Sequence, residues 1–190
     1  MIRLSLLAVL FTLLTGSTLL AQGGEGAMPD EMMMNAMPGP GHEPLKQMLG
    51  AWDQKVIVTM MPGMPPMEGS GTAENAMILG GRYVEGNGVI TAMGMTAKTK
   101  MFTGYDNRRS KYFLFAIDEL GTYAVTAEGE YDAAKRMWTF HGVEDDGKQK
   151  MKFRITTQMV GDSQMNSEIV FIMPDGTEHR AVRVESKRRA

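Results

Sequence analysis

Apolar and polar residues alternate with a period of two from Trp52 onward, and turn-forming residues interrupt the alternation roughly every 8 to 12 residues. Short strands joined by tight turns are typical of antiparallel sandwiches and barrels. A meander of this kind would leave two open edges unless its first and last strands paired. We therefore expect an all-β fold, a single closed, up-and-down antiparallel β-barrel of about ten strands. The expected strands are residues 52–61, 70–79, 82–90, 96–105, 111–117, 122–131, 136–143, 149–159, 167–173 and 178–185.

Two of the expected strands indicate which residues share a face. Trp138 and Phe140 fall on one face of their strand and His141 falls on the other, because side chains alternate along a strand. The strand at residues 111–117 is apolar on both faces, so something besides solvent must cover its outer face. Either the turn at residues 45–49 or a partner could cover it.

The first 21 residues have the layout of a secretory signal peptide. A basic start at Arg3 is followed by an uncharged apolar run over residues 4–14, and the small residue Ala21 marks the expected cleavage position. A membrane anchor is the alternative, but Gly16 and the hydroxyl residues around it shorten the apolar run. We predict an exported protein, periplasmic or extracellular, that is free of the membrane once residues 1–21 are removed.

The rest of the chain divides into a linker, one domain and a tail. Residues 22–44 are rich in methionine, glycine and proline and are predicted to be a disordered linker with one nascent turn at residues 30–35. This linker is expected to contribute nothing to the core. A short apolar helical turn at residues 45–49 is expected to plug one end of the barrel, with Trp52 anchoring the first strand beneath it. The barrel domain is expected to span residues 45–186, and residues 187–190 to form a basic tail.

Composition excludes several classes of function. Twenty lysines and arginines stand against 22 aspartates and glutamates, a formal charge of −2, so no strong field attracts nucleic acid. The absence of cysteine excludes disulfides, thiolate metal sites and cysteine nucleophiles. The serines lie near turns or strand ends and none sits in a nucleophile elbow. No catalytic residue is predicted, and we expect a protein that is not an enzyme.

The Gly50-Ala51-Trp52 sequence, with arginines on the last strand, resembles the calycin superfamily of lipocalins and fatty-acid-binding proteins. More closely, residues 45–185 resemble a bacterial exported family catalogued as domain of unknown function fifteen-seventy-nine. The resemblance implies a lipocalin-like barrel in which Gly50 and Trp52 are structural and either Arg180 or Arg183 lies across Trp52 as a cation–π contact. The blocks that show the closer resemblance are Leu49-Gly50-Ala51-Trp52, Pro65-Pro66-Met67, Gly71-Thr72-Ala73, Met77-Ile78-Leu79-Gly80-Gly81-Arg82-Tyr83, Phe102-Thr103-Gly104-Tyr105-Asp106-Asn107 and Gly129-Glu130-Tyr131-Asp132.

A closed barrel of this size leaves room for a small ligand, so we expect an interior site for a small, largely apolar molecule. Which side chains face inward depends on strand register, because a slip of one residue reverses the faces. No cofactor is predicted, and the oligomeric state is left open. The candidate ligand-binding residues are Tyr83, Tyr105, Phe113, Phe115, Tyr123, Trp138 and His141.

Three other functions are weighed against interior binding. The loop methionines Met61, Met64 and Met67, together with the linker, could form a thioether site for Cu(I), although methionine is also a flexible apolar filler. The related nitrobindins bind haem through a histidine near the chain end, where His179 lies, but their longer Gly-x-Trp-x-Gly-x-Gly motif is absent. A structural or interaction module would use the outer face of the strand at residues 111–117.

Overall fold

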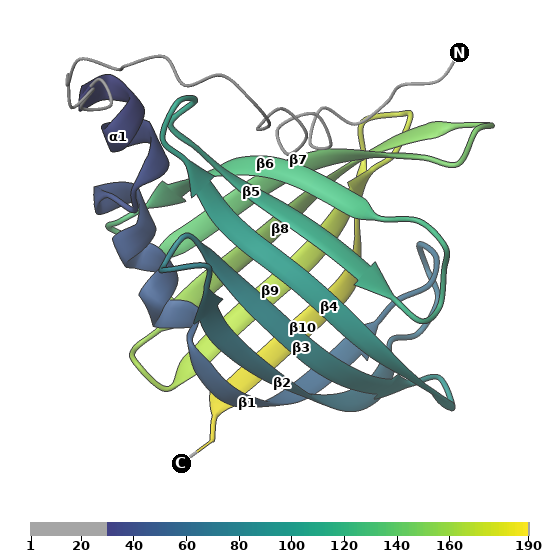
Figure 1. Ribbon diagram of the computed structural model, residues 1–190. Helices are drawn as coiled ribbons and strands as arrows, with labels where there is room; N and C mark the ends of the chain where they lie inside the picture. The colour runs from purple at the N-terminus through teal and green to yellow at the C-terminus, as the bar shows by residue number, and fades with distance from the viewer. Residues whose placement is uncertain (1–29, 190) are drawn as a thin grey trace, which may run out of the picture.

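The computed structural model describes residues 30–189. The predicted signal peptide (residues 1–21) and the first part of the predicted linker (residues 22–29) lie outside the described residues. Neither helix in the described part of the chain is long and apolar enough to cross a membrane. The elements, shown in Figure 1, are α1 (Asp30–Ala36), the 3₁₀ helix η1 (Pro40–Met48), β1 (Gly50–Val58), β2 (Met67–Ile78), β3 (Tyr83–Ala92), β4 (Met95–Asp106), β5 (Lys111–Asp118), β6 (Val125–Asp132), β7 (Met137–Asp145), β8 (Lys150–Val160), β9 (Gln164–Ile172) and β10 (Glu178–Arg188).

The ten strands form one closed antiparallel barrel in which each strand pairs with its neighbours in sequence. β1 completes the closure by pairing with β10, from Trp52 opposite Arg188 to Val58 opposite Val182. Every expected strand is present, with its ends shifted by a few residues. The predicted all-β, ten-stranded closed barrel is therefore confirmed.

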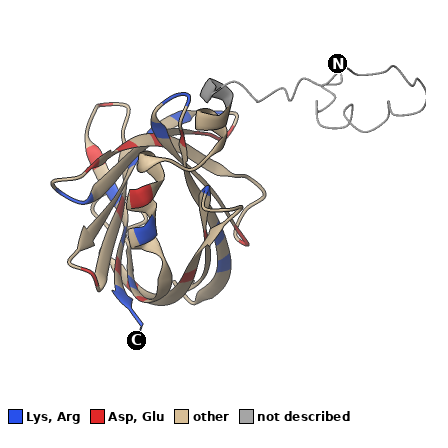
Figure 2. Ribbon diagram, turned by 60° about the vertical axis from the view of Figure 1, so that its left-hand side comes forward, with Lys and Arg blue, Asp and Glu red and all other residues tan. Residues whose placement is uncertain are grey.

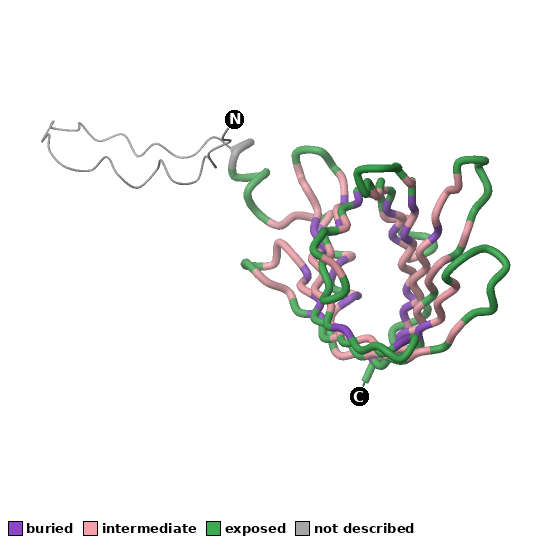
Figure 3. Tube along the Cα trace, turned by 90° about the vertical axis from the view of Figure 1, so that its right-hand side faces the viewer, coloured by how far each residue is buried: buried purple, intermediate pink, exposed green. Residues whose placement is uncertain are grey.

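Strand register decides which side chains fill the interior. Trp138 and Phe140 face inward, with exposed fractions of 0% and 1%. His141 follows Phe140 on the same strand, faces outward and is exposed. Buried and exposed positions alternate along the strand walls, whereas the loops are mostly exposed (Figure 3). The alternation seen in the sequence thus corresponds to an inner and an outer face, as expected.

The prediction of a disordered linker is wrong for residues 37–44, because most of η1 lies there, whereas the nascent turn expected at residues 30–35 is present as α1. Pro40 stands at the start of η1, where proline is compatible with a helix because its missing N–H would have no partner. His42 is 5% exposed, its Nδ1 accepts the backbone N–H of Gly39 at 3.1 Å, and its ring packs edge-on against Tyr105. The linker therefore contributes to the core at His42, contrary to the prediction.

η1 plugs one end of the barrel, as expected. Leu45 and Met48 on its inner side are 0% and 3% exposed. The carbonyl oxygen of Met48 accepts hydrogen bonds from Trp52 Nε1 at 3.0 Å and from Asn75 Nδ2 at 2.8 Å. The Tyr112 hydroxyl donates to the carbonyl oxygen of Gly41 at 2.7 Å. Side chains from several strands therefore fix the plug to the barrel.

The arginine across Trp52 is Arg188, not Arg180 or Arg183. The guanidinium carbon of Arg188 lies 4.3 Å from the Trp52 ring centroid, and this side chain also donates to the carbonyl oxygens of Gln47 and Leu49. Arg180 and Arg183 instead pair with the outer-face carboxylates Glu168 and Glu185.

Strand register explains why Arg188 is the arginine that contacts Trp52. Arg188 stands opposite Trp52 and shares the inner face with it, whereas Arg183 lies on the opposite face of β10. β10 also runs on to Arg188, and Arg189 forms an ion pair with Asp53 at 2.9 Å. Residues 187–189 are thus part of the barrel closure and not a free tail.

Replacing Tyr112 with phenylalanine is expected to lower the free energy of unfolding by about 1 kcal/mol, because the carbonyl oxygen of Gly41 in the plug loses its hydrogen-bond donor. Burial raises the pKa of Tyr112 to about 12, above the value of about 10 in an unfolded chain. The folded state holds this proton more tightly, so its stability falls as the pH rises from about 10 to about 12. Urea denaturation followed by circular dichroism at pH 8 and at pH 11 should show a smaller loss for Tyr112→Phe than for the wild type. Exposed Tyr123→Phe is the control, and an identical alkaline loss in Tyr112→Phe would contradict the assignment.

The outer face of β5 is covered only in part, by aromatic residues from neighbouring strands. Phe113 packs edge-on against Tyr83 with ring centroids 5.9 Å apart, and Phe115 lies against Phe102 at 6.2 Å. Phe115 is still 36% exposed and Ile117 is 40% exposed. The turn at residues 45–49 faces the barrel interior and therefore does not cover this surface.

Candidate functional site: the barrel interior

The barrel encloses a cavity of about 300 Å³ that begins at Met48 of the plug. Small residues on the inner faces of β2, β3 and β5, such as Ala73, Gly88 and Ala116, leave this space unfilled. The absence of a side chain at Gly88 also lets the Thr99 hydroxyl lie close to the backbone of β3, since a Cβ atom at Gly88 would lie 2.5 Å from Thr99 Oγ1. The volume is at the lower end of the range for small-molecule pockets.

Apolar side chains from most of the strands make up the larger part of the cavity wall. They include aliphatic residues on β9 and β10 as well as an aromatic ring on β7. This wall favours an apolar ligand because burial of apolar surface drives binding. Its members are Ile90, Met101, Leu114, Val125, Phe140, Ile155, Met165, Ile169, Val182 and Val184.

A set of uncharged polar side chains interrupts the apolar wall. Gln54 Nε2 donates to Ser186 Oγ at 3.3 Å, and the hydroxyls of Thr157 and Ser167 share a hydrogen bond of 3.0 Å. Ser186 is 1% exposed. Buried polar groups of this kind orient a ligand and give a pocket its specificity.

Two charged residues contribute to the cavity lining in the described part of the chain, Lys100 and Asp118. The Lys100 ammonium forms an ion pair with Glu85 at 2.6 Å, and this hydrogen bond lowers the pKa of Glu85. Asp118 ends β5 and accepts the backbone N–H of Leu120 at 2.8 Å. Charged residues of both signs are spread over the strands and loops of the barrel (Figure 2).

None of the seven candidate ligand-binding aromatic and histidine residues lines this cavity. Tyr105 and Trp138 lie toward the plug, where rings from neighbouring strands pack in sequence: Tyr105 on Tyr112 at 4.8 Å, and Tyr131 on Trp138 at 4.6 Å. Trp138 Nε1 is the single buried side-chain nitrogen or oxygen without a hydrogen-bond partner among the described residues. These rings belong to the packed end of the core.

The other candidates lie outside the barrel. The register places Tyr83, Phe113, Phe115 and His141 on the outer face, and Tyr123 is 61% exposed in the loop after β5. The interior residues that sequence reasoning missed are the small and hydroxyl residues. The face shared with Trp138 and Phe140, followed from strand to strand, would have indicated them.

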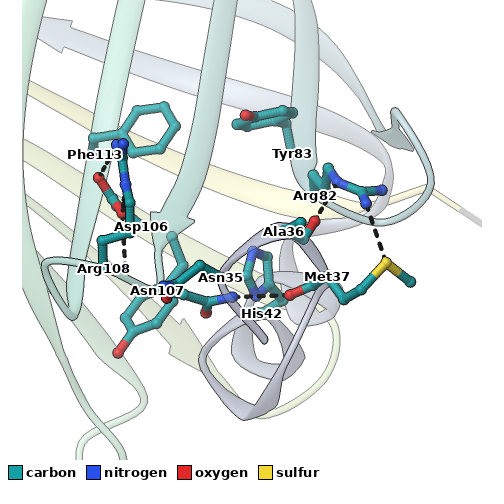
Figure 4. A pocket seen from close by; sticks show the side chains of 11 residues that line it. Asn35, Ala36, Met37, His42, Arg82, Tyr83, Asp106, Asn107, Arg108 and Phe113 are labelled. Carbon is teal, nitrogen blue, oxygen red and sulfur yellow. Dashed lines mark hydrogen bonds and ion pairs between the residues drawn. The ribbon is translucent and has the colours of Figure 1, made fainter. Parts of the chain in front are cut away.

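A second hollow, of about 530 Å³, lies outside the barrel between α1 and the ends of β3 and β4 (Figure 4). Tyr83, Tyr105 and Phe113 contribute to its walls, so three of the sequence candidates meet here. Arg82 Nε donates to the carbonyl oxygen of Ala36 at 3.0 Å, which fixes the end of α1 to the barrel. The two hollows share no lining residue.

The polar side of this outer hollow is largely satisfied by its own contacts. The Arg108 guanidinium beside Asp106 holds the pKa of that carboxyl at about 2. Asn107 Nδ2 donates to the carbonyl oxygens of Met34 and Met37, at 3.0 and 2.8 Å. Burial lowers the pKa of His42, which also lines the hollow.

The methionine and histidine candidates for metal or haem lie at the end of the barrel away from the plug. Met61 and Met64 are 61% and 46% exposed and occupy one turn, in which the Met64 N–H donates to the Met61 carbonyl oxygen at 3.1 Å. Met67 begins β2. His179 Nε2 lies 2.9 Å from the carbonyl oxygen of Thr59. Within residues 30–189, no three His, Cys, Asp or Glu residues gather as a metal site. Copper binding stays a prediction of the sequence.

Fold and interior together define a small, closed antiparallel β-barrel with a hollow core. The sequence profile of the family described as "Protein of unknown function (DUF1579)" matches residues 37–188, so the chain belongs to this family. No curated protein matches the sequence significantly. Among solved structures, the crystal structure of Rv2717c from M. tuberculosis is similar in fold, with a TM-score of 0.61 and 11% sequence identity, over 81% of this chain and 100% of that one.

Proposed function

We propose that this protein is an exported, non-catalytic barrel that binds one small, largely apolar molecule in its interior. The observation that supports the proposal is the cavity of about 300 Å³, walled by aliphatic and aromatic side chains with a few polar groups. Export is supported by the signal-peptide pattern of residues 1–21.

The polar side chains of the cavity fit a binding role better than a catalytic one. A serine nucleophile needs a general base within hydrogen-bond reach. Ser186 is hydrogen-bonded to the amide of Gln54, and Ser167 to the hydroxyl of Thr157, neither of which is a base near neutral pH. These groups can hold and orient a ligand, but they cannot activate a hydroxyl for attack.

The end of the barrel away from the plug offers an apolar approach to the cavity. Three loops that follow one another around this rim, between β1 and β2, β3 and β4, and β5 and β6, expose apolar side chains. Such a rim offers exposed apolar surface that an apolar molecule could contact on its way into the cavity. The exposed residues are Met60, Met61, Met64, Met93, Met95, Leu120 and Tyr123.

Native mass spectrometry of the full chain, exported by a bacterial host and purified without detergent, tests the proposal. We expect a species heavier than the processed chain by one small molecule, which organic extraction removes. Titration of the extracted protein with the neutral fluorescent probe N-phenyl-1-naphthylamine should then show one saturable site. Protein that carries no small molecule and binds no apolar probe would overturn the proposal.

A further inference from the structure

We propose that the cavity selects uncharged molecules with one hydrogen-bonding group, such as an alcohol or a primary amide, and discriminates against the carboxylate on the same carbon skeleton. The inference rests on the proposed function and names the class of ligand. It follows from the arrangement of the polar groups and from where the charges of the barrel are engaged.

The first step is that four uncharged polar groups form one polar wall of the cavity. Gln54 on β1 bonds to Ser186 on β10, and Ser167 on β9 bonds to Thr157 on β8. These four strands are consecutive around the barrel. The wall across from them, on β4 and β5, presents Met101, Leu114 and Ala116 together with Thr99, Thr103 and Asp118. The cavity thus combines apolar surface with uncharged hydrogen-bonding groups.

The second step is that this polar wall keeps hydrogen-bonding capacity for a ligand. A glutamine amide has two donor hydrogens and an acceptor oxygen, and each hydroxyl has one donor and two acceptor positions. The bond between Gln54 and Ser186 uses one donor and one acceptor. Glycine at position 71 lets the Gln54 amide lie close to the backbone of β2, since a Cβ atom there would lie 3.0 Å from Gln54 Oε1. An alcohol or amide group can therefore both donate and accept at this wall.

The third step is that the described lining offers no free cation to a carboxylate. Lys100 is paired with Glu85, and Arg188, which shares the inner face, is engaged with the plug carbonyls and the Trp52 ring. Asp118 accepts a backbone N–H and forms no ion pair among the described residues, so it adds a negative charge to the lining. A carboxylate entering the cavity would lose its hydration without gaining a counter-charge, which is unfavourable.

Displacement of N-phenyl-1-naphthylamine from the full, extracted chain by four ligands of equal length tests the inference. The ligands are decanol, decanamide, decanoate and decylammonium, compared at pH 7. We expect decanol and decanamide to displace the probe at concentrations at least ~10-fold lower than decanoate, a difference that corresponds to 1.4 kcal/mol. Decylammonium should bind better than decanoate, because Asp118 can serve as its counter-charge.

Two variants connect the preference to the polar wall. Thr157→Val, which replaces the hydroxyl by a methyl group, and Ser186→Ala should each weaken decanol binding several-fold more than they change the affinity for the probe. Thr156→Val is the matched control, because the adjacent residue lies on the outer face of the same strand and faces Glu168. Urea denaturation of each variant confirms that it is folded.

The outcomes separate the inference from the proposed function. Decanoate that binds as well as decanol overturns the inference but leaves interior binding intact. Thr157→Val and Ser186→Ala variants that bind decanol like the wild type also overturn it, because another part of the cavity would then make the selection. A chain that binds neither the probe nor any of the four ligands overturns the proposed function itself.

Discussion

Replacement of Trp52 by alanine is expected to lower the free energy of unfolding by about 3–5 kcal/mol, the range for truncation of a fully buried tryptophan. Trp52 is 0% exposed and joins the plug to the barrel wall. Its Nε1–H donates to the Met48 carbonyl oxygen at 3.0 Å, and the guanidinium of Arg188 lies over its ring at 4.3 Å. The substitution therefore removes core packing, a buried hydrogen bond and a cation–π contact together. Urea denaturation followed by far-ultraviolet circular dichroism measures the loss.

Two further variants show whether the loss has this origin. Trp52→Phe retains an aromatic ring but has no donor for Met48, so its stability should lie between those of the wild type and the alanine variant. Tyr123→Ala truncates an aromatic residue that is 61% exposed and should change stability by no more than about 0.5 kcal/mol. A Trp52→Ala protein as stable as Tyr123→Ala would show that the plug does not depend on Trp52.

Ala116→Phe is expected to weaken probe binding by at least ~100-fold, equivalent to about 2.8 kcal/mol, because the new ring occupies the cavity. Ala116 lies on β5 between Met101 of β4 and Val125 of β6 in the register, and all three line the cavity. Insertion of a larger side chain into a packed core costs about 1–3 kcal/mol, but here part of the added volume enters existing space. The variant should therefore fold and fail to bind. Probe fluorescence and urea denaturation on the same sample measure both properties.

Val89→Phe is the matched control for this experiment. Val89 is 40% exposed on the outer face of β3, so the same aromatic side chain is added outside the barrel. Its probe affinity should equal that of the wild type. If Ala116→Phe folds and still binds the probe with wild-type affinity, the ligand does not occupy the interior.

The strands and their closure could be predicted because most strands combine period-two alternation with a clear turn. The faces of β5 could not, since the strand is apolar on both sides: Tyr112 and Leu114 face inward, whereas Phe113 and Phe115 face outward. Only pairing with β6 decides between the two faces, because it sets Phe113 opposite Glu128, whose carboxylate pairs with Arg109 outside the barrel. That pairing joins residues far apart in the sequence, so the pattern of β5 alone does not show which of its aromatic side chains face the interior.

The two wrong predictions near the ends of the chain, the disordered linker and the arginine that contacts Trp52, have a similar origin. Prolines and glycines before residue 45 indicated disorder, but burial of His42 against Tyr105 and the bond from Tyr112 to Gly41 hold η1 in place. On β10, the arginine that meets Trp52 was expected too early in the strand. The register with β1 identifies it as Arg188. In each case a contact between distant residues overrides the local pattern.

Because β1 pairs with β10, the chain could begin at a different strand without any change in the strand pairing of the barrel. The backbone N–H of Arg189 donates to the carbonyl oxygen of Ala51 at 2.8 Å, so the two ends of the barrel are already neighbours. A peptide that runs from Arg189 back along η1 to Pro40 could join the last strand to η1, and the chain could be cut instead in the exposed loop at residues 119–124. Such a circular permutant would retain every ladder of the barrel, and η1 would then connect two covalently continuous strands instead of preceding the first.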